Sequence, residues 1–411
     1  MSKLLPNLLL TILIISLEKT SAHQKFREYY HWNLLDYAFP SLEEKLNAIL
    51  TRKFIPENNL PVGIEVWGDK IFITVPRWRE GIPSTLNYVT INDFVQESFK
   101  SPLLIPYPDL KSNEAGNCRD GLTTVYRIKA DQCNRLWVLD TGTFGIESTT
   151  QNLCPYTLKI FDLKTDRIIR KYELHPEDIR ETTFIANIAV DIGRNCEDAY
   201  AYMSDELGYG LIVYSWEHHK SWRFSHPFFN PDPVAGNFTI DGFNFQWDTE
   251  GIFSMVLSLP QGDGHKILFF NPLASYREFA VSTKILRDET KVNNSYNDFI
   301  ALNERGKNSH ITAKVMDEYG VEFFTLIDIN AIGCWYSGYP YATNFFKVLH
   351  RDDKNLIFPS DLKIDRKRNL WVISDRMSNF LYRGLNPTEV NFRILFAPIN
   401  DLIQNTVCGI Y

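Results

Sequence analysis

Short runs in which most residues are apolar recur along the chain, and their starting points lie 53 to 65 residues apart. The six runs are IFITVPRW (71–78), LWVLD (136–140), AYAYMSDE (199–206), IFSMVLSL (252–259), HITAKVMD (310–317) and LWVISDR (370–376). Most are followed by a second extended run that ends in a polar turn, as in TLKIFDLKTD (157–166). This pattern predicts four short strands in each unit. Helical periodicity is confined to 42–50 and 400–406.

A repeat of about 60 residues with four strands is typical of one blade of a β-propeller. A single twisted sheet with two apolar faces cannot bury either face alone, so neighbouring blades stack around an axis. Closure of the ring removes the open edges that a linear array would expose. The six copies therefore predict an all-β fold, a six-bladed β-propeller.

The N-terminus has the pattern of a secretory signal peptide. Lys3 precedes the apolar run LLLTILIISL (8–17), and Thr20 and Ala22 are small residues placed for cleavage before His23. We expect residues 1–22 to be this signal and residues 23–411 to form one secreted propeller domain. No apolar run reaches the roughly 18 residues of a membrane span, so no membrane partner is expected.

Six cysteines form an even set, which predicts disulfides in a secreted protein. The count alone allows 15 connectivities. The predicted topology places Cys133 and Cys196 in equivalent turns of adjacent blades and Cys118 and Cys154 near the opposite rim; these form two proposed pairs. The remaining pair, Cys334 with Cys408, would tie the C-terminus to the fifth blade.

Other features exclude several classes of function. The net charge is −7 with no block of basic residues, so nucleic acid is not an expected partner. No cysteine spacing is C-x-x-C, and the adjacent residues of Glu217-His218-His219 point to opposite faces of a strand, so we predict no metal site and no cofactor. The sequons at Asn237 and Asn293 predict N-glycosylation.

Candidate ligand-binding residues lie where the innermost strands begin and the second strands end, because both positions surround the channel mouth. The main candidates are Phe184 and Asn187 in the third blade, Asn244 in the fourth, and Phe358, Ser360, Asp361 and Asp375 in the sixth. Rings beside amides, hydroxyls and carboxylates suit a small aromatic ligand with polar groups. The alternative is that these side chains only satisfy backbone groups at strand ends.

Several long segments resemble the insect yellow and major royal jelly protein family. They include LPVGIEVWGDKIFITVPRWREGIPSTLNYV, YRIKADQCNRLWVLDTGT and FPSDLKIDRKRNLWVISDRM, and the resemblance runs from about residue 28 to the C-terminus. It implies a six-bladed propeller and a secreted role in dark cuticle pigmentation, with the extracellular matrix of the cuticle as a further partner. In amine-binding relatives the pocket resembles the sixth-blade rim, where Phe358, Ser360, Asp375 and Met377 occupy the matching positions here.

These observations favour a secreted factor of the melanin pathway that binds a catechol-derived indole or a biogenic amine in the channel mouth. A first alternative is a dopachrome isomerase, in which Asp375 would be the base and Ser360 and Asn187 would orient the substrate. A second is a calcium-dependent hydrolase of the lactonase type, because SDLKID and LWVISD also resemble blades of such propellers. Asn187, Asn244 and Asp361 would then supply oxygen ligands.

Overall fold

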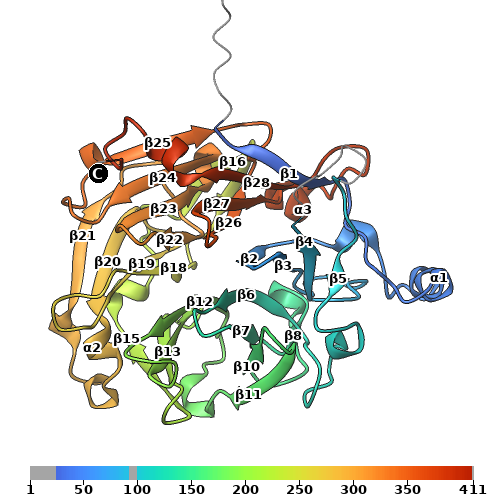
Figure 1. Cartoon of the computed structure of the whole chain (residues 1–411), viewed down its shortest axis with the longest axis horizontal. Helices are drawn as coiled ribbons and strands as arrows, with labels where there is room; N and C mark the ends of the chain where they lie inside the picture. The colour runs from blue at the N-terminus through green and yellow to red at the C-terminus, as the bar shows by residue number, and fades with distance from the viewer. Residues whose placement is uncertain (1–24, 92–99, 410–411) are drawn as a thin grey trace, which may run out of the picture.

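The computed structural model describes residues 25–91 and 100–409. The predicted signal peptide, residues 1–22, lies outside the described residues. Six four-stranded antiparallel sheets stand around a common axis, with β2, β6, β12, β18, β22 and β26 nearest the centre (Figure 1). The prediction of a six-bladed β-propeller is confirmed.

Each blade is one sheet whose strands follow the chain outward. The first contains β2 (Gly63–Trp67), β3 (Lys70–Thr74), β4 (Leu86–Thr90) and β5 (Ile105–Pro106). The second contains β6 (Val125–Ala130), β7 (Arg135–Asp140), β10 (Thr157–Asp162) and β11 (Arg167–Glu173). The third contains β12 (Ile185–Ile192), β13 (Ala199–Asp205), β14 (Gly210–Ser215) and β15 (Lys220–Ser225).

The other three blades follow the same plan until the ring closes. The fourth contains β18 (Ile252–Leu257), β19 (Ile267–Pro272), β20 (Arg277–Ser282) and β21 (Phe299–Glu304), and the fifth contains β22 (Lys314–Met316), β23 (Val321–Leu326), β24 (Ala331–Tyr336) and β25 (Phe346–Arg351). The sixth combines β26 (Pro359–Ile364), β27 (Asn369–Ser374) and β28 (Phe392–Pro398) with β1 (Arg27–Trp32). Its outermost strand therefore comes from the N-terminal part of the chain and pairs antiparallel with β28.

The apolar runs of the repeat do not all occupy equivalent places. Those that begin at 71, 136, 199 and 370 form second strands, whereas those at 252 and 310 lead into the innermost strands β18 and β22. The assumption that all six runs are equivalent is wrong. The fourth blade begins later than expected because residues 237–246 form a separate hairpin of β16 (Asn237–Ile240) and β17 (Phe243–Gln246).

The remaining elements are small. A second ribbon pairs β8 (Thr143–Phe144) with β9 (Gln151–Asn152). The expected helix at 42–50 is α1 (Leu42–Leu50), which projects beyond the ring (Figure 1), and the C-terminal one is shorter than expected, α4 (Ile399–Ile403). The sequence did not predict α2 (Thr283–Leu286) or α3 (Met377–Tyr382).

The repeated segments before LWVLD and LWVISD contain the same turn. The Asp131 carboxylate accepts hydrogen bonds from its own turn and, at 2.7 Å, from the Trp137 indole N–H. In the second copy, the Asp365 carboxylate accepts a hydrogen bond from the backbone of its own turn and, at 2.8 Å, one from the Trp371 indole N–H. The aspartate thus fixes the turn and satisfies the polar atom of a buried indole, which explains why the two stretches are alike.

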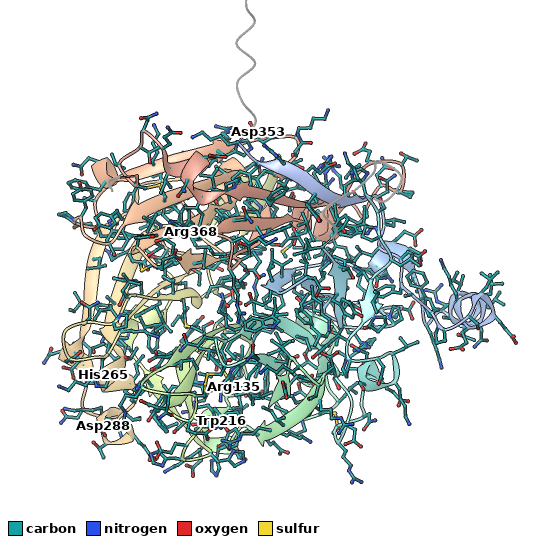
Figure 2. The ribbon with its side chains drawn as sticks, in the orientation of Figure 1. Arg135, Trp216, His265, Asp288, Asp353 and Arg368 are labelled. Carbon is teal, nitrogen blue, oxygen red and sulfur yellow. A yellow bond between two sulfur atoms is a disulfide. The ribbon has the colours of Figure 1, made fainter. Side chains whose placement is uncertain are left out.

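The three disulfides join the pairs that the topology predicted. Cys133–Cys196 links the turns of the second and third blades. Beside it, the Arg135 guanidinium donates to the Cys196 carbonyl at 2.8 Å and lies over the Trp216 ring (Figure 2). Cys118–Cys154 lies within the second blade, and Cys334–Cys408 ties the C-terminal segment to β24.

Candidate ligand pocket at the propeller mouth

A cavity of about 430 Å³ opens where the innermost strands begin. Its aromatic wall consists of Trp78, Tyr126, Tyr156, Phe184, Trp247, Phe253 and Phe358. The Tyr126 ring lies at the middle of this wall, with centroids 5.6 Å from Trp78 and 5.5 Å from Phe184. A cavity of this size in which polar groups lie among aromatic rings is typical of a small-molecule site.

Bulges in the backbone shape the rim. The pairing register shifts at the start of β6, β12, β18 and β26, between each innermost strand and its neighbour. A bulge adds one unpaired residue, bends the strand and redirects the side chains that follow. Phe358, just before β26, also has a positive φ of 49°, an uncommon conformation for a residue with a bulky side chain. The sixth-blade rim is therefore built from irregular backbone at the cavity wall.

Four of the predicted ligand-binding residues line the cavity: Phe184, Phe358, Ser360 and Met377. Phe184 precedes β12, Phe358 and Ser360 belong to the entry into β26, and Met377 begins α3 at the end of β27. Ser360 is 1% exposed, and its hydroxyl interacts with the Asp375 carboxyl group behind the wall. A hydroxyl in the cavity wall can also accept a hydrogen bond from a polar group of a ligand.

Asp375, the candidate base, lies behind this wall and is fully buried. One carboxylate oxygen accepts from the Met377 N–H at 3.0 Å, and the Ser360 hydroxyl interacts with the carboxyl group from the cavity side. Burial raises the pKa of Asp375 to about 8, against the opposing effect of the nearby Ser360 hydroxyl. Asp375 is not among the residues that line the cavity, so it is not placed to act directly on a ligand there.

Three predicted residues lie away from the cavity wall, and their assignment to it is corrected. The Asp361 carboxylate forms ion pairs with Arg127 and Lys363. This buried cluster of Arg127, Asp361 and Lys363 between the innermost strands is called the hub below. The Asn187 side chain accepts from the backbone N–H of Ile188 at 2.9 Å, the strand-end role that was the alternative for such residues. Asn244 is exposed on the β16–β17 hairpin, because the residues around it are not the start of the fourth blade.

The hairpin that carries Asn244 has a turn signal in the sequence. Asp241 and Gly242 both have positive φ, 49° and 80°, and they connect two strands with alternating aromatic residues. Asp-Gly between alternating apolar positions strongly indicates a two-residue hairpin turn. This dipeptide was the signal that could have separated residues 237–246 from the fourth blade.

The sequence analysis did not identify a pair of carboxyl groups in the cavity wall, Glu206 and Glu250. Glu206 follows β13 and is 3% exposed, and Glu250 lies just before β18 of the next blade. Burial, the charge of Glu250 and a hydrogen bond between the two side chains raise the pKa of Glu206 well above its usual value. Two such carboxyls therefore hold a proton at a pH where isolated glutamates are ionised.

Glycine explains how the two segments come close enough. A Cβ atom at Gly251 would lie 2.5 Å from the Glu206 carbonyl oxygen, a distance that side chains do not tolerate. The absence of a side chain at position 251 lets the backbone beside Glu250 lie directly against the end of β13. Glu206 was visible in the run AYAYMSDE, but only the fold shows that Glu250 faces it.

The family model described as major royal jelly protein matches residues 123–408. A protein called protein yellow from Drosophila yakuba is 56% identical over 402 residues, which cover 98% of this chain and 74% of that protein. Protein yellow from Drosophila melanogaster is 55% identical over 403 residues, with the same coverage of both chains. The chain belongs to the major royal jelly protein family.

Membership of the major royal jelly protein family, together with the similarity to protein yellow, supports a pigmentation-related function of the yellow type. The three disulfides also fit an extracellular protein of this family. Within the described part of the chain, no helix is both long and apolar enough to cross a lipid bilayer.

More distant similarity extends to other solved structures. A virginiamycin B lyase from Staphylococcus aureus with quinupristin is 12% identical, with a TM-score of 0.44 and coverage of 84% of this chain and 97% of the lyase. A luciferin-regenerating enzyme is 10% identical, with a TM-score of 0.44 and coverage of 84% and 94%. Similarity at this level carries no information about function.

Proposed function

We propose that this protein is secreted and acts in the cuticle melanin pathway by binding a catechol-derived indole or amine in the cavity at the propeller mouth. The observation that supports the proposal is the cavity itself, whose wall combines seven aromatic side chains with hydroxyl, amide and carboxyl groups. Flat rings stack well on such a wall, while phenolic and amino groups bind hydroxyls and carboxylates.

Binding by the purified protein tests this proposal. Dopamine, tyramine, dopachrome and an indole carboxylate would be titrated by calorimetry, with quenching of the fluorescence of Trp78 and Trp247 as a second signal. We expect saturable binding of at least one aromatic compound with one ligand per chain. If none of the four compounds binds at millimolar concentration, the proposal is wrong.

A dopachrome isomerase is the second candidate, favoured by the Glu206–Glu250 pair. Isomerisation requires a group that removes a proton from carbon and a group that returns one elsewhere. Glu206, whose pKa is raised, and the neighbouring Glu250 are two carboxyl groups in the cavity wall that could share this work. The loss of dopachrome absorbance, compared between the native protein and Glu206→Gln, tests this candidate. A rate that exceeds the spontaneous one and falls at least 100-fold in the variant supports catalysis.

The calcium-dependent hydrolase is not proposed further. Asn187 and Asn244 lie away from the cavity wall, and Asp361 is engaged by two cations in the hub. In residues 25–91 and 100–409, no three or more side chains of Asp, Glu, His or Cys gather as they would around a metal ion. Calcium in proteins requires six to eight oxygen ligands, which these positions do not supply together.

A further inference from the structure

We propose that the doubly protonated ring of His310 holds the β16–β17 hairpin against the fifth blade and thereby makes the cavity sensitive to pH. His310 lies before β22, and the hairpin leads directly into Trp247, a residue of the cavity wall. The effect on the cavity rests on the proposed function, whereas the contact between His310 and the hairpin is a property of the fold.

Both nitrogens of the buried His310 ring face hydrogen-bond acceptors. Nδ1 lies 2.9 and 2.7 Å from the two carboxylate oxygens of Asp328, which belongs to the short helix η9 (Ile327–Ile329) of the fifth blade. Nε2 lies 2.7 Å from the carbonyl oxygen of Ala235, just before the hairpin. An ionised carboxylate and a carbonyl can only accept, and an imidazole ring with two N–H donors is the cation. The geometry therefore assigns a positive charge to His310.

Loss of one ring proton to water would remove the contact with the hairpin. A neutral imidazole has a single N–H and cannot donate to both acceptors. The hydrogen bond to the charged Asp328 is the stronger of the two, so the remaining proton stays on Nδ1. The lone pair of Nε2 then faces the Ala235 carbonyl, and the hairpin loses this hydrogen bond to the fifth blade.

Aromatic rings connect the contact to the cavity wall. Phe238 of β16 stacks on the His310 ring, with centroids 3.9 Å apart and planes inclined by 25°. The aromatic face attracts a positive ring more than a neutral one. Phe238 in turn contacts Trp247 edge to face at 5.6 Å, and Phe245 of β17 does the same at 4.6 Å. The position of Trp247 in the wall thus depends on contacts that begin at His310.

Charged and titratable groups from the neighbouring elements lie around the contact. They are Asp328 in η9, Tyr276 before β20, Asp232 before the hairpin and Arg305 after β21. Burial, and then the charge of Asp328, raise the pKa of Tyr276, so this phenol stays neutral near pH 7. The Arg305 guanidinium is paired with Glu278 at 2.9 Å and keeps its charge. The ring of His310 is therefore the group to which the pH dependence is assigned.

The protonation of the ring can be measured directly by NMR. The nine histidines of the full chain would be labelled with ¹⁵N, and His310 assigned as the signal that is absent from His310→Gln. At about pH 6 we expect both ring nitrogens of His310 to be N–H groups whose protons exchange slowly, because the ring is buried. A His310 ring with one bare nitrogen at that pH would overturn the proposal.

Hydrogen exchange of residues 235–247 measures how firmly the hairpin is held. After correction for the intrinsic exchange rate, protection of the native hairpin should fall by roughly tenfold or more between about pH 5.5 and about pH 8, because one proton is lost from the ring. The matched control is His175→Gln, which replaces an exposed histidine and should keep the same dependence. Protection that does not change with pH in the native protein contradicts the proposal.

Asp328→Asn separates the role of the proton from a purely structural role of the site. The asparagine amide can donate to Nδ1, so a neutral ring can keep its one proton on Nε2 for the Ala235 carbonyl. The hairpin should then remain protected at both pH values, whereas in His310→Gln it should exchange rapidly at both. A native-like pH dependence in Asp328→Asn would overturn the proposal, and this comparison decides even if His310→Gln does not fold.

Binding of 4-ethylphenol, which is uncharged at both pH values, tests the effect on the cavity. Its affinity for the native protein should fall between these pH values by at least about threefold more than its affinity for Asp328→Asn. Titratable groups in the cavity are the same in both proteins, so the difference reports on His310. Equal pH dependence would show that His310 does not regulate the cavity. If 4-ethylphenol and the other aromatic compounds fail to bind while the exchange results hold, the proposed function is wrong and the His310 contact stands.

Discussion

Arg127 and Asp361 form a buried ion pair across the hub, with 3.2 Å between a guanidinium nitrogen and a carboxylate oxygen. Arg127 belongs to the second blade and Asp361 to the sixth, on either side of the first. The guanidinium also donates to the carbonyls of Val62 and Ser360, and the carboxylate accepts from the Ile64 N–H at 2.9 Å. The ion pair therefore links the sixth, first and second blades through side-chain and backbone contacts at the point where the ring closes.

Replacement of Asp361 by Asn should destabilise the protein by about 3 kcal/mol, because Arg127 and Lys363 would remain buried without their carboxylate. Burial opposes ionisation, but the two cations outweigh it and hold the pKa of Asp361 below its usual value. The stabilisation is thus present above about pH 4 and lost as the pH falls further. Denaturant unfolding of the native protein and of Asp361→Asn at pH 7 measures this loss of stability.

The control for this substitution is Glu289→Gln, which breaks an ion pair with Lys220 whose side chains are about half exposed. Exposed pairs contribute roughly 1 kcal/mol or less, because water and salt screen them. Equal losses in Asp361→Asn and Glu289→Gln would contradict the role assigned to the hub.

Replacement of Asp375 by Asn should weaken the dependence of stability on pH. Burial raises the pKa of Asp375 to about 8 in the folded protein, against about 3.9 in an unfolded chain. The folded state thus holds an extra proton between these values, and its stability falls with rising pH by at most about 1.4 kcal/mol per unit.

Asparagine cannot ionise and retains an oxygen for the Met377 N–H, so Asp375→Asn should be more stable than the native protein at pH 8 by up to about 5 kcal/mol. Near pH 4 the two proteins should have similar stability. The difference between their unfolding free energies from pH 4 to 9 is the measurement, and parallel curves would show that Asp375 is ionised throughout.

Phe184→Ala and Asn244→Ala should affect ligand binding differently, although the sequence predicted a binding role for both residues. The Phe184 ring is part of the cavity wall, whereas the Asn244 side chain is exposed on the hairpin. Loss of the ring should weaken binding of 4-ethylphenol roughly tenfold, equivalent to about 1.4 kcal/mol. Asn244→Ala should leave the affinity unchanged, and a comparable loss in both variants would place the ligand elsewhere.

Removal of Cys334–Cys408 by serine substitution should lower the free energy of unfolding by about 2 to 4 kcal/mol. The bridge spans 74 residues, and Cys118–Cys154 spans 36, so the second bridge closes a loop about half as long. In the chain-entropy model, halving the loop reduces the stabilisation by roughly 0.6 kcal/mol. Denaturant unfolding of the two double-serine variants gives the comparison, and a larger loss for the shorter loop would contradict it.

The sequence predicted the architecture because burial between blades requires a repeated apolar unit. It did not predict which strand of a blade each apolar run forms. In the fourth blade, β18 and β19 are both almost entirely buried, and strands covered on both faces show no alternation of apolar and polar residues. The pattern alone therefore cannot distinguish an innermost strand from its neighbour.

The direction in which side chains point at the rim was the second feature that the sequence could not predict. Ser360 and Asp361 are adjacent in the sequence, and the first faces the cavity while the second faces the hub. Adjacent strand residues point to opposite faces, but the register shift between Pro359 and Asp361 makes it impossible to tell from the sequence which of the two faces the cavity. The contact between Glu206 and Glu250 was equally hidden, since it depends on how two neighbouring blades meet.

The pairing of β1 with β28 has a consequence for biosynthesis. The first strand of the ring has no partner until the last one has been made, so a nascent chain carries an unpaired edge for nearly the whole of its synthesis. A premature stop anywhere before Phe392 leaves that edge exposed permanently. Truncated alleles should therefore yield material that quality control retains and degrades, with no partially active product.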